Sequence, residues 1–513
     1  MSNIVIFAGS DRAFAEAVQE LSLANPFLPA RIECERRALG ADFRDAGAEW
    51  NRLAPAWQAH PNLVLIRERV HALVTRAASV WPKSPAGRVA RADARLFTNL
   101  VLFEIYLRFS ARFDEAVRSA LAGAGAPGRR VGFFAEFRDE VERGLRRPGL
   151  AILEESPPEH IFACLFQLRR AFHHIHYSLV GGSPALGRLR ASIWESVFTR
   201  DLELYRQVFW RRMHDFTTLI AGPSGTGKEL VARAISLARY VPFDPRRAVF
   251  ASDFVESFYP LNLSALSPTL VESELFGHRK GAFTGALQDH VGWLETCPPE
   301  GTVFLDEIGE VEPALQVKLL RVLQVRTFQR LGETKVRQFR GKIIAATNRD
   351  LPAEIRSGRF REDFYYRLCS DQIRTPSLRD QLKEAPAELT PLVTFILAQH
   401  VGEAHATELT GGTVRWIEDN LGRDYTWPGN VRELEQCVRN LLLRGAYTPA
   451  GPWAAPGADD WNGLVGRGRR TAEQLLQRYT RHVHAQSDGN IEETARRLDV
   501  DRRTVKARLA APA

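Results

Sequence analysis

Three apolar runs, each ending in polar or glycine-rich residues, constrain the fold of this chain most. They read "FTTLIAGPSGTGKE" from Phe216, "GTVFLDEIGE" from Gly301 and "GKIIAATNRD" from Gly341. Runs of this length, separated by helical patterns, are typical of parallel strands in an α/β sheet that is covered on both faces. Ligands bind at the carboxyl ends of such strands. The polar residues that end the three runs are therefore predicted to form one site.

The first run ends in a predicted phosphate-binding loop, which lies between a strand and the helical pattern "ELVARAISLARY". This context is the one that a G-x-x-x-x-G-K loop requires. Backbone N–H groups and the helix dipole would bind the phosphates, and Lys228 would neutralise them. Glu229 stands where Ser or Thr usually ligates magnesium. The predicted nucleotide-binding residues are Gly222, Pro223, Ser224, Gly225, Thr226, Gly227, Lys228 and Glu229.

Acidic and amide side chains follow the other two runs. Asp306 suits the coordination shell of Mg²⁺, Glu307 suits the activation of the attacking water, and Asn348 could sense the γ-phosphate. A solvated strand end would explain one acidic pair, but three strands that end in the same way argue against coincidence. The sequence predicts a Mg²⁺-dependent ATPase site.

Two later segments add positive charge. "GRFREDFYYRL" offers Arg359, Arg361 and Arg367 as groups that could stabilise the transition state, and the sequence leaves open which one acts. In "WPGNVRELEQ", Asn430 is predicted to cap a helix. Arg432 in its first turn opposes the helix dipole, which makes it a candidate contact for nucleotide phosphate.

The stretch "GHRKGAFTGALQD", residues 277–289, places Phe283 and Thr284 between Gly281 and Gly285. Glycine at both ends disfavours helix and strand, so we predict a mobile loop. An aromatic residue at the tip of such a loop suggests contact with a partner.

The C-terminal module is basic, because residues 465–513 contain eleven Arg or Lys and six Asp or Glu, a net charge of +5. Residues 487–511 predict two short helices, the first capped by Asn490 with Glu493 completing a capping-box-like pattern. A basic second helix fits helix–turn–helix recognition of DNA, and the alternative is a basic helix pair used only for packing. The predicted DNA contacts are Arg502, Arg503, Thr504, Lys506 and Arg508.

The N-terminal region, residues 1–178, predicts a mixed but mainly helical fold with "NIVIFAG" as an opening strand. His173, His174 and His176 lack partner ligands at a metal-site spacing, so we interpret them as incidental residues of a hinge. The five cysteines are scattered, and neither a signal peptide nor a run long enough to span a bilayer is visible. These features predict a cytoplasmic protein without a membrane partner.

Together these motifs resemble the sigma-54-dependent transcriptional activators, the bacterial enhancer-binding proteins of the AAA+ class, with a Fis-type helix–turn–helix. "ESELFGHRKGAFTGA", "GTVFLDEIGE", "GRFREDFYYRL" and "WPGNVRELEQ" occur in the order of the family, which also carries glutamate after the phosphate-loop lysine. The resemblance covers a little over half of the chain. It implies a multidomain fold in which an α/β AAA+ parallel-sheet core with a helical lid precedes an all-α helix–turn–helix.

The resemblance also implies roles for single residues. Asn262 matches the asparagine that restrains the catalytic glutamate, Arg361 and Arg367 match arginines that act across a subunit boundary, and Arg432 matches the second sensor. The implied contact with sigma-54 consists of Gly281, Ala282, Phe283, Thr284, Gly285 and Ala286.

The implied domains are a regulatory or sensory region at 1–178, the ATPase subdomain at 179–385, the lid at 386–447, a linker at 448–470 and the helix–turn–helix at 471–513. The implied partners are sigma-54 with RNA polymerase holoenzyme, double-stranded enhancer DNA, and further copies of the chain, from dimer to hexameric ring. ATP and Mg²⁺ are the implied ligands.

Two functions from different classes stay open at this point. The first is an ATP-driven activator that remodels the closed complex of sigma-54 RNA polymerase into an open complex. The second is a DNA-binding repressor or regulator that does not act on sigma-54 and uses nucleotide as a switch. An AAA+ chaperone or helicase loader would not explain the Fis-like terminus.

Overall fold

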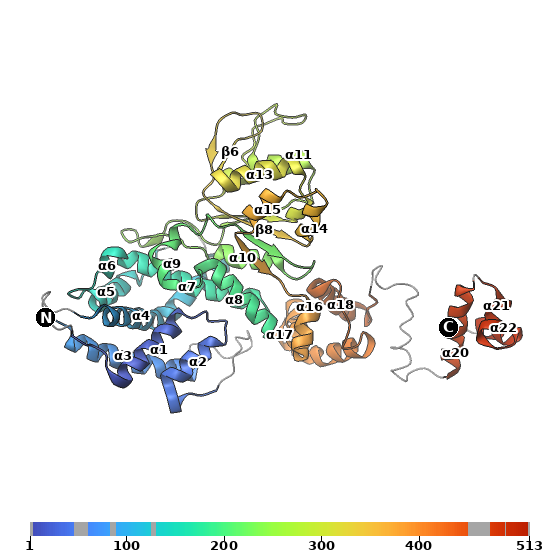
Figure 1. Cartoon of the computed structure of the whole chain (residues 1–513), viewed down its shortest axis with the longest axis horizontal. Helices are drawn as coiled ribbons and strands as arrows, with labels where there is room; N and C mark the ends of the chain where they lie inside the picture. The colour runs from blue at the N-terminus through green and yellow to red at the C-terminus, as the bar shows by residue number, and fades with distance from the viewer. Residues whose placement is uncertain are drawn as a thin grey trace. The chain divides into compact units, whose positions relative to one another are not determined.

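The computed structural model describes residues 4–45, 60–82, 89–124, 130–449, 472–487 and 489–510. The chain divides into two compact units, residues 1–443 and 444–513 (Figure 1). Most of the predicted linker at 448–470 lies outside the described residues. No helix within the described ranges is both long enough and apolar enough to cross a membrane.

The first unit is built on a five-stranded sheet in which every paired strand is parallel. Its spatial order is β4 (Phe258–Asn262), β5 (Thr302–Asp306), β8 (Lys342–Thr347), β1 (Thr218–Ala221) and β9 (Asp371–Arg374). The three strands predicted from the apolar runs are β1, β5 and β8, which lie side by side. The predicted α/β parallel-sheet core is confirmed.

Alternate residues of these strands enter different cores, as the two-residue period of a strand requires. Val303 and Leu305 pack with the core on one face, whereas Phe304 between them packs with the core on the other face. Both faces are therefore apolar, which explains why β5 reads as a continuous apolar run instead of an alternating one.

Helices cover both faces of the sheet. One face carries α11 (Pro268–Phe276), α13 (Pro313–Val325) and α15 (Glu362–Leu368), and the other carries α8 (Pro184–Phe198) and α10 (Lys228–Leu237). After β9 the chain is helical, as predicted, with α16 (Leu378–Glu384), α17 (Leu389–Asn420) and α18 (Asn430–Arg444). Gly402 adopts a left-handed conformation that breaks α17 into two helical parts.

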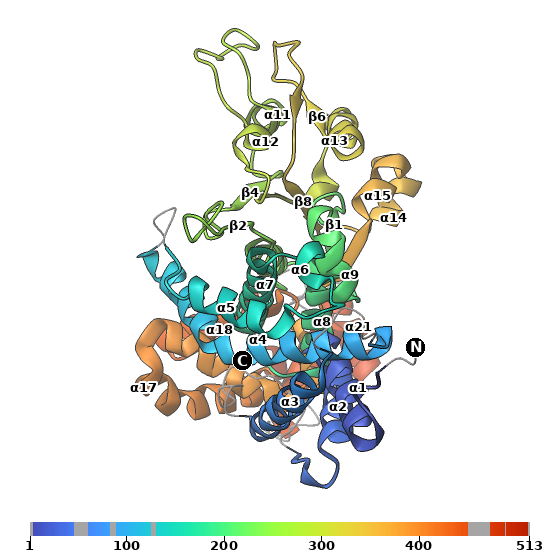
Figure 2. The same cartoon turned by 90° about the vertical axis from the view of Figure 1, so that its left-hand side faces the viewer.

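The N-terminal region forms a helical layer of the first unit (Figures 1 and 2). Its α-helices are α1 (Gly9–Leu23), α2 (Ala30–Leu39), α3 (Pro61–Val80), α4 (Arg91–Ser119), α5 (Phe134–Leu145), α6 (Ile152–Glu155) and α7 (Pro158–Ser178). Their core also includes Val241, Phe243 and Phe254, which belong to and flank the hairpin of β2 (Phe243–Asp244) and β3 (Val249–Phe250). The helical layer and the sheet region therefore share apolar packing.

The predicted opening strand is wrong. Ile4 makes only an isolated bridge to Val89, and the chain enters α1 at Gly9. The carboxylate of Asp93 accepts hydrogen bonds from the backbone N–H groups of Ile6 and Phe7, at 2.7 and 3.3 Å. A side chain from the start of α4 thus satisfies the groups that a neighbouring strand would otherwise bind.

The interpretation of the histidines as a hinge is also wrong. His173, His174 and His176 lie within the 21-residue helix α7, where His173 and His174 are buried. Burial and the neighbouring His173 lower the pKa of His174 well below its usual value. Among the described residues no group of His, Cys, Asp and Glu side chains is arranged to hold a metal ion.

The second unit contains α20 (Ala472–Gln486), α21 (Ile491–Leu498) and α22 (Arg502–Ala510). Asn490 caps α21 as predicted, because its Oδ1 accepts hydrogen bonds from the N–H groups of Glu492 and Glu493. The predicted capping box is incomplete, since the Glu493 carboxylate pairs with Arg496 and Arg497. Thr494 and Val505 are fully buried between the helices.

Candidate functional site

The polar ends of β1, β5 and β8 meet at one edge of the sheet. Parallel pairing places Ala221 opposite Thr347, and Leu305 opposite Ala345. The phosphate loop, the acidic pair and Asn348 follow these positions directly. The structure therefore brings together the residues that the three runs predicted as one site.

The phosphate loop is packed so closely that two of its glycines have no room for a side chain. A Cβ at Gly222 would lie 2.1 Å from Thr375 Oγ1, and one at Gly225 would lie 2.3 Å from the carbonyl oxygen of Gly429. Gly227 has a φ of 84° at the N-cap of α10, so Lys228 is the first helical residue. This helix start aims backbone N–H groups at the site, which favours an anion.

Lys228 is buried and donates hydrogen bonds to the carbonyl oxygens of Gly222 and Pro223, at 3.1 and 3.2 Å. Burial lowers the pKa of Lys228, while the charges of Glu307 and Asp306 act in the opposite direction. The ammonium group thus lies within the field of the acidic pair. Glu229, on the next position of α10, is exposed.

Glu307 combines two costly features. Its φ of 56° is rare for a residue other than glycine, and such backbone strain costs about 1–3 kcal/mol. Its Oε2 atom is buried without a hydrogen-bond partner among the described residues. Its backbone N–H donates to Asp306 Oδ1 at 3.0 Å, which joins the two acidic residues in one turn. Costs of this kind concentrate at functional sites.

These residues fit a magnesium nucleotide. The half-buried Asp306 carboxylate supplies the hard oxygen donor that Mg²⁺ prefers, and the glycine-lined loop supplies N–H donors for phosphate. The orphaned Glu307 oxygen leaves one acceptor available for a water molecule.

The segment that begins α18 lies on the phosphate loop. Asn430 Nδ2 donates to the Ser224 carbonyl oxygen at 2.9 Å, and the Val431 N–H donates to the Gly225 carbonyl oxygen at 3.1 Å. Arg432 donates to Ser224 Oγ at 3.3 Å, so the structure places it beside the loop.

The predicted helix cap by Asn430 is wrong. Asn430 is the first residue of α18 and has a φ of 53°. Its Oδ1 accepts from the N–H of Leu378, 52 residues earlier in the chain. Asn430 therefore joins α16 and the phosphate loop instead of satisfying its own helix.

The remaining predicted residues lie at the surface of this chain. Asn262 is exposed at the end of β4, and its Oδ1 accepts from the N–H and the hydroxyl of Ser264. Asn348 is exposed after β8. Arg361 pairs with Asp363 at 2.7 Å and Arg359 pairs with Glu354 at 2.6 Å, whereas Arg367 is exposed on α15.

Sequence reasoning missed Thr375 and Gln316. The Thr375 hydroxyl lies 2.7 Å from the Thr226 hydroxyl and supports the phosphate loop from the end of β9. The fully buried Gln316 donates to the Arg359 carbonyl oxygen and accepts from the Arg361 N–H, at 3.0 and 2.8 Å. A polar residue on the apolar face of a predicted helix, as Gln316 is in "QVKLLRVLQ", was the available signal.

The loop at 281–286 follows α11 and projects away from the sheet (Figure 2). The Gly281 N–H donates to the Ala286 carbonyl oxygen, and the Ala286 N–H donates to the Phe283 carbonyl oxygen. The loop is thus closed by its own backbone. Thr284 is exposed, as expected for a contact residue, but Phe283 is half-buried against His278, with ring centroids 4.9 Å apart. The more exposed apolar side chain is Leu287, 80% of which is accessible.

On α22 of the second unit, the predicted DNA contacts differ in their pairing. Arg502 pairs with Glu492 at 2.6 Å, and Arg508 pairs with Glu473 at 3.7 Å. Arg503 and Lys506 are exposed, and Thr504 is half-buried.

Comparisons with known proteins relate part of this chain to a described family. Residues 198–374 match the family described as "Sigma-54 interaction domain". The chain is 43% identical over 232 residues to the hydrogenase transcriptional regulatory protein HoxA of Bradyrhizobium diazoefficiens, covering 45% of this chain and 43% of HoxA. It is 45% identical over 230 residues to the Nif-specific regulatory protein of Azotobacter vinelandii, and the match covers 44% of this chain and 40% of that protein. The chain thus spans less than half the length of these two relatives.

A solved structure of NtrX from Brucella abortus in complex with ATP is similar at 27% identity and a TM-score of 0.39, over 64% of this chain and 68% of NtrX. The transcriptional regulatory protein ZraR of Salmonella typhimurium is 35% identical over 341 residues, which are 65% of this chain and 68% of ZraR. The ZraR match, together with the matched domain and the five-stranded parallel sheet, shows that the chain belongs to the family of sigma-54-dependent transcriptional activators.

Proposed function

We propose that this protein hydrolyses ATP as a ring oligomer and uses the 281–286 loop to convert the closed complex of sigma-54 RNA polymerase into an open complex. The observation that carries the proposal is that a strained, partly unpartnered Glu307 and the closed 281–286 loop occur within one segment that matches a sigma-54 interaction domain.

The chain's own residues divide the chemistry of hydrolysis. Lys228 and the loop N–H groups bind the phosphates, while Asp306 holds Mg²⁺, which offsets negative charge on the phosphates. Glu307 takes a proton from the attacking water molecule. At the same time the water oxygen bonds to the γ-phosphorus, and the bond between that phosphorus and ADP breaks. Asn348 and Arg432 sense the nucleotide. Asn262 restrains Glu307 when its side chain leaves Ser264 and forms a hydrogen bond with the glutamate instead.

A ring accounts for the placement of the arginines. Arg361 and Arg367 are exposed on the segment held by Gln316, where they can reach the site of a neighbouring copy. An arginine supplied across such a boundary raises the rate by about 10³–10⁵. In this arrangement residues 179–385 and 386–447 form the ATPase subdomain and its lid, and residues 1–178 regulate them.

Transcription in vitro with purified components tests the proposal. We expect transcripts from a sigma-54 promoter only with sigma-54 holoenzyme, this protein and ATP, and no effect on sigma-70 holoenzyme at its own promoter. An effect on the sigma-70 reaction without any effect on sigma-54 would instead favour the nucleotide-switched regulator, and activation of sigma-54 without ATP would contradict the ATP-driven mechanism.

We also propose that residues 471–513 bind double-stranded enhancer DNA through α22. Arg503 and Lys506 are exposed there and suit phosphate contacts. Arg503→Ala should weaken DNA binding and lower the slope of log affinity against log salt by about 1. Fluorescence anisotropy with labelled duplex DNA measures both, and Arg496→Ala, on the neighbouring helix, is the matched control. An unchanged slope would contradict the assignment.

A further inference from the structure

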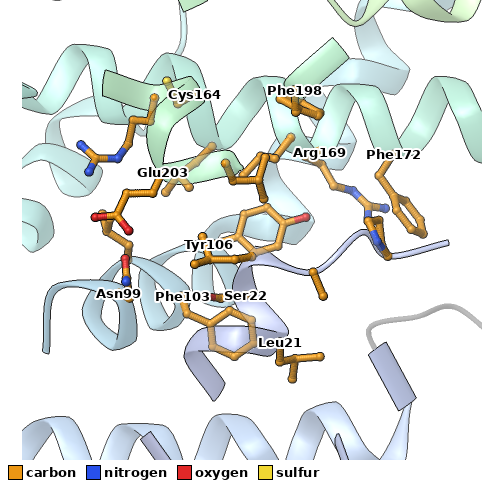
Figure 3. Close-up of a pocket in the computed structure, with 18 of the residues that line it drawn as sticks. Leu21, Ser22, Asn99, Phe103, Tyr106, Cys164, Arg169, Phe172, Phe198 and Glu203 are labelled. Atoms are coloured by element: carbon orange, nitrogen blue, oxygen red, sulfur yellow. The ribbon is translucent and has the colours of Figure 1, made fainter. Parts of the chain in front are cut away.

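A cavity of about 190 Å³ lies in the helical layer, between α1, α4, α7, α8 and α9 (Leu202–Gln207). Apolar and aromatic side chains form most of its wall (Figure 3). They include Leu102, Phe103, Tyr106, Phe172, Trp194 and Phe198. An engineered apolar cavity of about 150 Å³ is large enough to bind benzene. The size therefore suits a molecule with one ring or an equivalent short chain.

Three of the charged side chains of the wall have ion-pair partners within the protein, and the fourth, Arg206, donates a hydrogen bond to the Ser156 hydroxyl at 2.6 Å. Arg169 pairs with Asp114 at 2.7 Å, and Arg31 pairs with Glu35. Glu203 pairs with Arg95 at 2.5 Å. A cationic ligand would have to break one of these ion pairs, and an anionic ligand would have to break one or compete with Ser156 for Arg206, which is costly in an apolar space. The wall therefore favours a neutral molecule.

Asn99 is an uncharged polar residue of the wall. It is only 8% exposed, and its Nδ2 has no hydrogen-bond partner among the residues that the structure describes. A buried polar group without a partner is costly, because nothing replaces the hydrogen bonds that it lost from water. Asn99 shares one face of α4 with Leu102, Phe103 and Tyr106, because these positions follow the helical repeat. The amide therefore belongs to the wall that would contact a ligand.

We propose that this cavity is a binding site for a small, neutral and largely apolar molecule of about one ring, which forms a hydrogen bond with the Asn99 amide. An amide offers both donor and acceptor, so a hydroxyl or carbonyl group satisfies it. The apolar part of the ligand makes van der Waals contacts with the wall, which are absent when the cavity is empty.

The cavity shares a helix with the phosphate-loop region. Leu168 and Phe172 of α7 line the cavity, while Gln167 of the same helix donates to the carbonyl oxygen of Ala238 at 2.9 Å. Ala238 is the C-cap of α10, the helix that begins at Lys228. A ligand in the cavity would therefore contact the helix that supports the far end of the phosphate-loop helix.

Binding of 4-fluorophenol and of fluorobenzene to the full-length protein tests the proposal, with ¹⁹F NMR titration as the measurement. The two probes match in size, and only 4-fluorophenol carries a hydroxyl group. We expect saturable binding of both, with 4-fluorophenol tighter by about fivefold or more, as one hydrogen bond provides.

Asn99→Leu should remove this preference and leave fluorobenzene binding within twofold, which also shows that the variant is folded. Ala24→Phe, which adds a ring to the cavity wall, should abolish binding of both probes, and Asn420→Leu, at an exposed asparagine of α17, should change neither. The site is overturned if neither probe saturates or if Ala24→Phe binds normally. Equal probe affinities, or a preference that survives Asn99→Leu, would overturn the assigned role of Asn99.

Discussion

The glycines of the phosphate loop and of the 281–286 loop both include residues with positive φ, such as Gly225 at 75°, but only those of the phosphate loop are also limited by space. In the phosphate loop, a Cβ at Gly222 or Gly225 would collide with Thr375 or Gly429. In the 281–286 loop, a Cβ would meet no atom within 4 Å at either Gly281 or Gly285. There the glycines are required by φ values of 81° and 101°.

The difference separates a loop whose glycines pack against other segments from a loop whose glycines face open space. The phosphate loop is contacted by Thr375, which follows β9, and by Asn430 at the start of α18, so a change in the loop is transmitted to both segments. The 281–286 loop has backbone hydrogen bonds across its own turn and an open outer side. It suits contact with a partner. Four substitutions examine this comparison, in order of decreasing effect on ATP hydrolysis.

Glu307→Gln should reduce hydrolysis by about 100-fold or more, because an amide cannot accept the proton from water. Nucleotide affinity should stay within about threefold, since Lys228 and the loop N–H groups are unchanged. Phosphate release and titration with a fluorescent ATP analogue measure the two quantities. Glu312→Gln, at an exposed position nearby, is the control. Normal turnover in Glu307→Gln would remove its assigned role.

Gly225→Ala should weaken nucleotide binding about tenfold, because the new methyl group forces the loop away from Gly429. Overpacking of this kind costs about 1–3 kcal/mol. The same nucleotide titration measures the effect. Gly411→Ala, in α17, has open space and should bind normally. If Gly225→Ala also binds normally, the close packing of the phosphate loop is not required.

Gly285→Ala should leave ATP hydrolysis within twofold but loosen the 281–286 loop. Placing an L-residue at positive φ costs about 1–2 kcal/mol. The loss should appear as about 5- to 30-fold faster hydrogen exchange in a peptide covering residues 277–289. Unchanged exchange would show that the backbone conformation of this loop does not depend on glycine.

Thr284→Ala should have the smallest effect on hydrolysis, because the exposed hydroxyl lies outside the catalytic edge of the sheet. Open-complex formation with sigma-54 holoenzyme should nevertheless be lost, as measured by permanganate footprinting. Gln288→Ala, an exposed neighbour, should retain it. Promoter opening by Thr284→Ala would contradict the role of the loop as the contact.

Local patterns predicted three of the five strands and the polar residues that meet at their carboxyl ends, since each of these strands and its polar end lie within about ten consecutive residues. The predicted opening strand failed because Asp93, more than eighty residues later, satisfies its backbone. The predicted cap failed for the same reason, as Asn430 bonds to Leu378 and Ser224. Thr375 was missed because its role depends on the pairing of β9 with β1.

The amino-acid sequence by itself determined the presence of β1, β5 and β8, the glycine-rich run after β1, the acidic pair and the loop between Gly281 and Gly285. Periodicity and short-range spacing encode these features, because they depend on neighbouring residues. Only the tertiary structure decided the strain at Glu307, the half-buried position of Phe283 and the cavity beside Asn99. Each of these depends on side chains from distant segments, whose packing no local pattern specifies.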